Sequence, residues 1–196
     1  MLSRRRLLTI PAAALLGLAR LGAQAKQEKK PRRAPDVPYV PTTEEAVKAM
    51  LGLAGVTKND VVYDLGCGDG RIVVSAAKNM GARGVGIDIN PVRIAEAREN
   101  AKKAGVEDLV RFEENDLFEA KISEATVVTL FLLSNINLKL RPRLLKELKP
   151  GTRIVSNTFD MGDWKPEKEV DVGGEDEESF LSKRLFLWRV PEPPKP

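Results

Sequence analysis

The stretch from Val61 to Val74 constrains the fold more than any other part of this sequence. It reads VVYDLGCGDGRIVV: an apolar run ends in Asp64, three alternating glycines follow, and an amphipathic segment begins at Arg71. Such an apolar run is typical of a buried parallel strand, and closely spaced glycines let the backbone turn tightly and approach a ligand. The stretch therefore predicts a strand, a tight turn that binds a nucleotide-like ligand, and the start of a helix.

The acidic side chains of this stretch indicate which ligand the turn accepts. A dinucleotide loop binds a pyrophosphate on backbone N–H groups and a helix start, so carboxylates at Asp64 and Asp69 would repel that ligand. They suit a cation, and S-adenosylmethionine carries a sulfonium and an α-ammonium beside an adenosine. The spacing G-x-G-x-G, with Arg71 where the dinucleotide fingerprint has its third glycine, favours the same ligand. Alternatively, the glycines only make a tight turn.

Strand and helix patterns alternate along the rest of the chain. This order indicates a doubly wound, Rossmann-like α/β fold, with a mainly parallel seven-stranded sheet and an antiparallel C-terminal strand. The last two strands are expected to flank an exposed hairpin that contains the acidic residues 175–178. Besides the strand that begins at Val61, the predicted elements are a helix that ends near Leu53, helices at 71–80, 91–104 and 136–148, and strands at 83–88, 109–116, 125–133 and 152–157.

Polar side chains follow several of these strands at their carboxyl ends, where open α/β sheets bind ligands. Asp88 can accept both hydroxyls of a ribose, or it can cap the next helix in competition with Asn90. Asn115 and Asp116 follow the next strand, where an acidic side chain can accept the exocyclic amine of adenine. Asp116 could instead belong to ordinary loop chemistry.

Two further places are expected to lie near the reacting groups. Ser134 and Asn135 follow the most apolar strand and would face the transferable methyl; alternatively, they only cap the next helix. Tyr39 and Thr42 precede the first helix, for which Thr42 or Thr43 is a suitable N-cap. This helix could cover the cofactor or pack against a sheet edge.

The first 25 residues are typical of an export signal rather than of the fold. They combine a basic start, a short apolar stretch and an Ala-x-Ala ending, and Ser3 to Leu8 resembles a twin-arginine signal. Residues 26–37 are expected to form a linker, and residues 38–192 the folded domain. The signal predicts a periplasmic or membrane-attached protein; the alternative is a cytoplasmic protein with an uncleaved leader.

Composition excludes several kinds of site. The chain has no histidine and only one cysteine, Cys67, so the sequence offers neither a disulfide partner nor a cluster of metal ligands around it. No metal is therefore predicted. The net charge of +4 comes from residues 1–33, which hold nine basic residues and one acidic residue, whereas the remainder has 23 basic and 27 acidic residues. The folded part is mildly acidic, which argues against a nucleic-acid partner.

Several motifs together resemble the seven-strand S-adenosylmethionine-dependent methyltransferases. Within these, the chain is similar to a protein-lysine methyltransferase family whose mitochondrial members modify the ATP synthase c-subunit and the adenine nucleotide translocase. The motifs that carry this resemblance are Pro38 to Pro41, Asp64 to Val73 with Asp88, Asn90-Pro91, Asp116-Leu117, Gly151 to Ser156, Trp164 to Pro166 and Trp188 to Pro191.

The resemblance implies a role for each matching residue. Asp64 and the glycines would hold the methionine part of the cofactor, Asp88 the ribose, and Asp116 would lie beside the adenine. The full set of expected cofactor contacts is Thr42, Asp64, Gly66, Cys67, Gly68, Gly70, Asp88, Asn115, Asp116 and Leu117, and the candidate catalytic residues are Tyr39, Ser134 and Asn135.

The function that the resemblance implies is S-adenosylmethionine-dependent N-methylation of a lysine on a protein, which could be membrane-associated. Transfer from a sulfonium is a direct displacement that needs alignment more than acid–base groups, so the lack of histidine is no obstacle. One alternative is an exported binding module that kept the fold without turnover; another is an NAD-dependent oxidoreductase. The sequence predicts neither the substrate's identity, nor the number of methyl groups, nor the oligomeric state.

Overall fold

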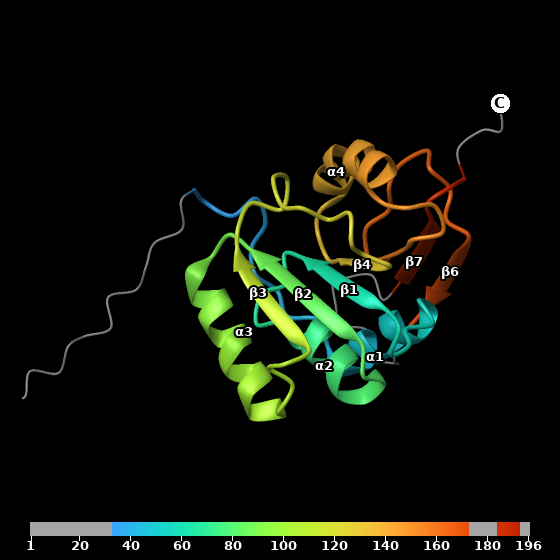
Figure 1. Ribbon diagram of the computed structural model, residues 1–196. Coiled ribbons are helices and arrows are strands. Elements are labelled where there is room, and N and C mark those ends of the chain that lie inside the picture. Colours follow the sequence, from blue (N-terminus) through green and yellow to red (C-terminus); the bar gives the residue numbers. More distant parts are fainter. Residues whose placement is uncertain (1–32, 173–183, 193–196) are drawn as a thin grey trace, which may run out of the picture.

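The computed structural model describes residues 33–172 and 184–192 (Figure 1). The predicted export signal, most of the predicted linker and the acidic residues 175–178 lie outside the described residues. Within the described part of the chain, no helix has the length and apolar character that crossing a membrane would need.

A seven-stranded sheet forms the centre of the domain, with strand order β3-β2-β1-β4-β5-β7-β6. Neighbouring strands from β3 to β5 are parallel, whereas β7 is antiparallel to both β5 and β6. The predicted α/β fold with a mainly parallel sheet and one antiparallel C-terminal strand is therefore confirmed. The strands are β1 (Val61–Leu65), β2 (Arg83–Asp88), β3 (Val110–Glu114), β4 (Val127–Leu130), β5 (Arg153–Asn157), β6 (Lys168–Asp171) and β7 (Arg184–Arg189).

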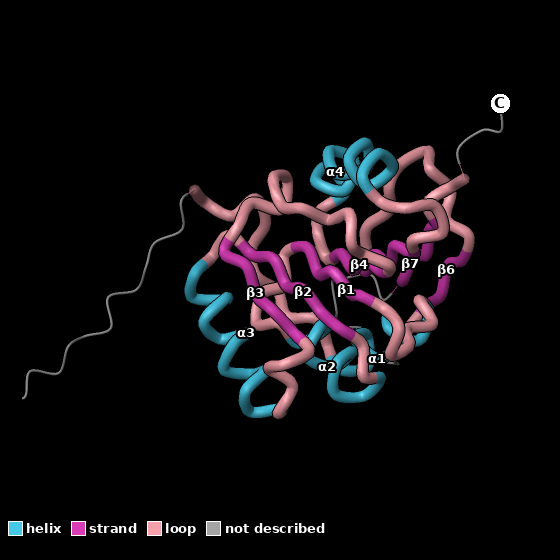
Figure 2. The backbone as a smooth tube through the Cα atoms, in the orientation of Figure 1, coloured by secondary structure: helices cyan, strands magenta, loops and turns pink. Residues whose placement is uncertain are grey.

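Helices cover both faces of the sheet (Figure 2). On one face lie α1 (Glu44–Leu53), α2 (Arg71–Met80) and α3 (Pro91–Ala104), and on the other lies α4 (Ser134–Glu147). Alternate residues of β1 serve the two faces, because successive side chains of a strand point in opposite directions. Val62 packs toward α1 and α2, whereas Tyr63 and Leu65 pack in the core beneath α4.

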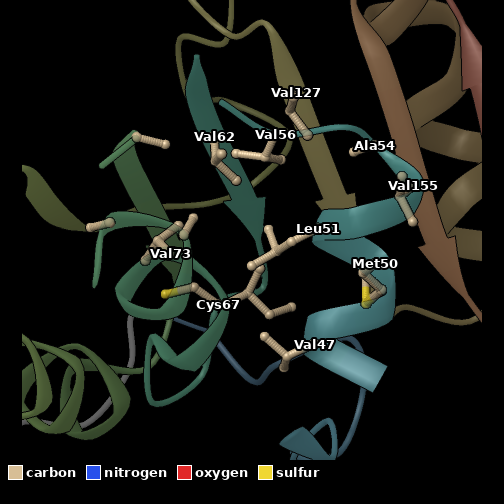
Figure 3. Close-up of a cluster of buried hydrophobic side chains, with 14 of the residues drawn as sticks. Val47, Met50, Leu51, Ala54, Val56, Val62, Cys67, Val73, Val127 and Val155 are labelled. Carbon is tan, nitrogen blue, oxygen red and sulfur yellow. The ribbon is translucent and has the colours of Figure 1, made fainter. Parts of the chain in front are cut away.

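The core under α1 and α2 fixes the start of the glycine turn (Figure 3). Met50 and Leu51 of α1 belong to one buried cluster with Val62 of β1 and Val73 of α2, and all four side chains are buried. Cys67 contributes its side chain to the same cluster. The turn that follows β1 is thus held by packing from behind as well as by its own backbone.

Two predicted boundaries beside this turn are wrong. The structure places β4 at Val127–Leu130 instead of 125–133, and α4 begins at Ser134 instead of 136. β4 is short because its partner β1 ends at Leu65, where the chain turns, so the parallel ladder ends at Leu130. The backbone carbonyl of Leu133 accepts hydrogen bonds from the N–H groups of both Ile136 and Asn137, which starts the helix two residues early.

Gly70 is the residue at which the turn becomes α2, and its lack of a side chain is structural. Its φ is +76°, and a Cβ there would lie 2.6 Å from Phe112 Cε1 and 2.8 Å from Ala97 Cβ. A side chain at this position would therefore meet both an unfavourable backbone conformation and the packed face of α3 and β3.

We expect Gly70→Ala to lower the free energy of unfolding by about 3 kcal/mol, the sum of left-handed backbone strain and overpacking. Urea unfolding would measure this change. Gly105→Ala is the matched control, because Gly105 has φ +69° and no atom within 4 Å of the added Cβ. That control should lose only about 1 kcal/mol, the cost of the backbone conformation alone. Equal losses in the two variants would contradict the packing role of Gly70.

Candidate active site

A cavity of about 420 Å³ lies at the carboxyl ends of the central strands. Its volume is in the range of small-molecule sites. One wall is a segment that we call the N-terminal strap, residues 33–42, which in Figure 1 begins in blue near the ends of β2 and β3. The other walls come from the glycine turn, the residues after β2 and β3, and Phe131 and Leu132 after β4.

Asp64 lines the cavity as a buried carboxyl group with no cationic partner among the described residues. Its side chain is 3% exposed, and its Oδ1 accepts a hydrogen bond of 2.8 Å from Thr129 Oγ1. Burial, and to a smaller extent the negative charges of Asp88 and Asp69, raise the pKa of Asp64 to about 7, against the effect of the Thr129 hydrogen bond. An ionised carboxylate in this position would be stabilised by a bound cation, as the α-ammonium or sulfonium of S-adenosylmethionine provides.

Asp69, in contrast, already has a cationic partner. Its Oδ2 lies 2.7 Å from Arg71 Nη2 and its Oδ1 lies 2.9 Å from Arg71 Nε. Although burial acts in the opposite direction, these hydrogen bonds and the charge of Arg71 lower the pKa of Asp69. The expectation that Asp64 and Asp69 both invite a cation is therefore wrong for Asp69, because the turn folds Arg71 back onto it.

Asp88 is fixed at the end of β2 by two backbone groups. Its Oδ2 accepts a hydrogen bond from Gly68 N at 2.9 Å, and its Oδ1 accepts one from Asn90 N at 2.8 Å. Asn90, not Asp88, caps α3, since its side chain accepts from Val92 N. A carboxylate accepts several hydrogen bonds, so Asp88 keeps capacity for the hydroxyls of a ribose.

The residues of the glycine turn divide between the cavity and the core. Gly66 and Cys67 line the cavity, whereas Gly68 and Gly70 do not. The Cys67 thiol points into the buried cluster, where burial raises its pKa well above the usual value. A Cβ on Gly68 would collide with the Tyr39 ring of the strap, so Gly68 allows the strap to close over the turn.

Asp116 reaches the cavity but is bound by the strap. Its Oδ2 accepts hydrogen bonds from Arg33 Nε at 2.9 Å and from Arg33 Nη2 at 2.7 Å, and its Oδ1 accepts one from Phe118 N. Leu117 lines the same cavity. Asn115 borders a neighbouring hollow of about 220 Å³ and uses its Oδ1 to accept from Asp116 N.

Tyr39 and Thr42 both lie on the cavity wall. The Tyr39 ring stacks under the guanidinium of Arg93, whose Cζ is 4.5 Å from the ring centroid. Burial and the nearby charge of Asp69 raise the pKa of Tyr39, so its hydroxyl is a neutral phenol and no base at neutral pH. Thr42 is buried and its carbonyl accepts from Arg71 Nη1 at 2.6 Å, while Thr43 is the N-cap of α1.

The structure does not bring Ser134 and Asn135 into the cavity wall. They are the first two residues of α4, whose N-cap is Leu133, so they do not cap the helix either. The cavity is lined at this end by Phe131 and Leu132. The sequence does not mark Phe131 and Leu132 as cavity residues, because they continue the apolar run of β4 and resemble buried core residues.

Three comparisons with known proteins now bear on this geometry. The family model described as the ANTKMT methyltransferase domain matches residues 64–168, from the buried acid of the turn to β6. The chain belongs to this methyltransferase family. The predicted family is thereby confirmed.

Two relatives and one solved structure show how similar the chain is to other methyltransferases. The chain is 47% identical to a protein-lysine N-methyltransferase of Saccharolobus islandicus over 81% of its own length and 96% of that protein. It is 34% identical to the lysine N-methyltransferase of the ATP synthase c-subunit from Xenopus laevis, over 67% of its length and 57% of that protein. A solved structure from Salinibacter ruber, described as an RNA methyltransferase in complex with S-adenosyl-L-homocysteine, shares 55% identity and a TM-score of 0.73, covering 79% of this chain and 95% of that one.

The family and its structures make this protein an S-adenosylmethionine-dependent methyltransferase, as predicted. The cavity fits that cofactor, because the buried, unpaired Asp64 lies where a cationic ligand is needed and Asp88 presents a fixed carboxylate. Sequence reasoning missed two of the cavity's arginines, Arg33 and Arg93, since neither belongs to a motif.

Proposed function

We propose that this methyltransferase transfers a methyl group to the side-chain amine of a lysine on a protein. The observation that carries the proposal is the 47% identity to a protein-lysine N-methyltransferase across 96% of that relative. The family model covers Asp64, Asp88 and Asp116 of the cavity, and the relatives from Xenopus laevis and Mus musculus are also named as lysine N-methyltransferases.

S-adenosylmethionine, when bound, supplies a methyl carbon on a positively charged sulfur; an N–C bond forms as the S–C bond breaks and sulfur keeps the electron pair. Asp64 would bind the α-ammonium and Asp88 the ribose hydroxyls, which together hold the cofactor in one orientation. Such alignment supplies about 7–11 kcal/mol of the barrier. The acceptor lysine, with a reference pKa of about 10.4, would lose its proton to water on burial beside the sulfonium.

The protein substrate could be membrane-associated, since one relative is named for methylation of the ATP synthase c-subunit. The export-like residues 1–25 motivate a further proposal, that the protein acts in the periplasm or attached to a membrane. Fractionation of native cells with N-terminal sequencing would test it. Intact residues 1–25 on a cytoplasmic protein would contradict this localisation.

A second candidate function is methylation of RNA. It is supported by the Salinibacter ruber structure, which is described as an RNA methyltransferase and shares 55% identity with this chain. The mildly acidic composition after residue 33 favours the protein substrate, because RNA binding relies on clustered lysine and arginine.

Transfer of a radiolabelled methyl group to a cell extract would decide between these substrates. We expect label that is removed by proteinase and survives ribonuclease, and that is recovered as methyl-lysine after acid hydrolysis. Label removed by ribonuclease would establish RNA as the substrate. No label with either fraction, from a protein that binds the cofactor, would favour the binding module without turnover.

A further inference from the structure

The sheet order separates the two ends of the cavity. Asp88 follows β2 and Asp116 follows β3, both on one side of Asp64 in β1, whereas Phe131 follows β4 on the other side. If the ribose lies at Asp88, the cofactor extends from β2 toward β1. The next strand in the same direction is β4, so the acceptor is expected to approach from the Phe131 end.

Two aromatic rings form the surface at that end. Phe131 and Phe159 stack with ring centroids 6.4 Å apart and an interplanar angle of 27°. Each side chain is partly exposed. Phe131 lines the cavity, whereas Phe159, which comes shortly after β5, is not among the lining residues and adjoins the cavity through its stack with Phe131.

An unfavourable backbone conformation brings Phe159 to this place. Thr158 has φ +69°, a left-handed conformation that costs about 1–3 kcal/mol for a residue other than glycine. The turn is closed by a hydrogen bond of 2.8 Å from Phe159 N to Asn157 O. Residues in such conformations persist where the surroundings hold them, and they cluster at functional sites.

Asn137 of α4 holds this turn from behind, together with Ser156, whose Oγ donates to Phe159 O at 2.6 Å. Asn137 is fully buried, and its Nδ2 donates to Ser156 Oγ at 3.2 Å, Phe159 O at 3.1 Å and Asp160 O at 3.2 Å. Its Oδ1 has no hydrogen-bond partner among the described residues, which costs stability. An apolar side chain could be buried here at a lower free-energy cost. The amide is therefore better explained by its hydrogen bonds to the turn that carries Phe159.

The aromatic surface suits an amine that must lose its proton. The acidic residues that follow Phe159 have other partners than an incoming amine. Asp160 is exposed and accepts from Gly162 N, and Asp163 is paired with Arg141. The ring faces attract the arriving lysine ammonium and the methylated, cationic product alike, while the apolar surroundings exclude water and so lower the cost of releasing the proton beside the sulfonium.

We propose that Phe131 and Phe159 form the wall of the acceptor site, where they receive the lysine side chain, and that Asn137 is a positioning residue that acts through Phe159. This inference rests on the proposed lysine substrate. It concerns the acceptor, so cofactor affinity is expected to be independent of Phe159, which is not among the lining residues of the cavity.

Substitutions of the wall test the proposal with the full-length protein. In Phe131→Leu and Phe159→Leu we expect the KM for a methyl-accepting protein to rise about tenfold, since the π faces are lost while apolar volume is largely kept. For Phe159→Leu, whose ring is not among the lining residues of the cavity, calorimetry should give a Kd for S-adenosylmethionine within about twofold of the wild type. Phe159→Trp should keep or lower the KM, because an indole binds cations better than a benzene ring. Phe118→Leu, a partly exposed ring outside the cavity wall, is the matched control.

The positioning role of Asn137 is tested by a double-mutant cycle with Phe159 as well as by the single substitution. We expect Asn137→Leu to raise the KM as Phe159→Leu does, and the double variant to be no worse than either single variant, because both act on one ring position. Additive effects would overturn the positioning role. If wild-type protein methylates lysine and both Phe→Leu variants keep the wild-type KM, Phe131 and Phe159 do not form the acceptor site, and the proposed function stands. If wild-type protein methylates no lysine, the proposed function itself fails.

Discussion

Asp64→Asn is expected to abolish measurable cofactor binding, with a loss of more than about 100-fold in affinity, while making the ligand-free protein more stable at pH 8. The loss follows because a neutral amide cannot pair with the cofactor's ammonium, and hydrogen bonds to charged groups are among the strongest. Calorimetric titration with S-adenosylmethionine would measure the affinity. The substitution keeps the side-chain shape, and the amide oxygen can still accept from Thr129 Oγ1.

The gain in stability follows from the pKa. The folded-state pKa of Asp64 is about 7, and an unfolded aspartate has a pKa of about 3.9. The folded protein therefore binds more protons between these values, and the free energy of unfolding falls as pH rises from about 4 to about 7. Three pKa units correspond to about 4 kcal/mol at pH 8, which the neutral amide would recover. Thermal unfolding should show most of the gain at pH 8 and only about 1 kcal/mol of it at pH 4.5, where the unfolded carboxyl is already largely ionised.

Asp60 offers a matched control at the opposite end of β1. It is also a buried aspartate, but it accepts from Thr126 Oγ1 at 2.7 Å and pairs with Arg153. Burial opposes the change, yet these partners and Thr57 lower its pKa. Asp60→Asn should therefore destabilise the protein and leave cofactor affinity unchanged. A cofactor affinity of Asp64→Asn within threefold of the wild type would refute the role given to Asp64.

Cofactor affinity should also depend steeply on pH, and this is the second large effect. Binding the ammonium requires ionised Asp64, so the affinity rises with pH until the carboxyl is fully ionised. With a pKa of about 7, the ionised fraction rises about 25-fold between pH 5.5 and pH 7.5. The cofactor's α-amino group, with a reference pKa of about 7.7–8.0, stays mainly protonated over this range.

Calorimetric titrations at these two pH values, at equal ionic strength, would measure the change in Kd. Among the neighbours with displaced pKa values, Asp69 moves to lower pH, and Tyr39 and Cys67 move to higher pH, all away from this window. A Kd that is constant within twofold would mean that Asp64 is not the group that meets the positive charge.

The fold and the Asp64 carboxyl group of the site can be predicted from the sequence alone. Apolar runs and glycine breaks predict α2, β2 and α3 to the residue, because strand and helix periodicities are local properties that do not depend on distant partners. Asp64 was identified for a similar reason: a carboxylate at the end of a buried strand, before a glycine turn, has few other roles.

The charges that remain unpaired in the cavity and the position of its aromatic end depend on how the chain folds. Arg71 neutralises Asp69, and Arg33 reaches Asp116 across 83 positions, so both pairings depend on how the chain folds back rather than on spacing. Phe131 and Phe159 stack because β4 and β5 are neighbours in the sheet. A sequence gives the chemistry of each side chain, but the charge and shape of a cavity are sums over groups that meet only after folding.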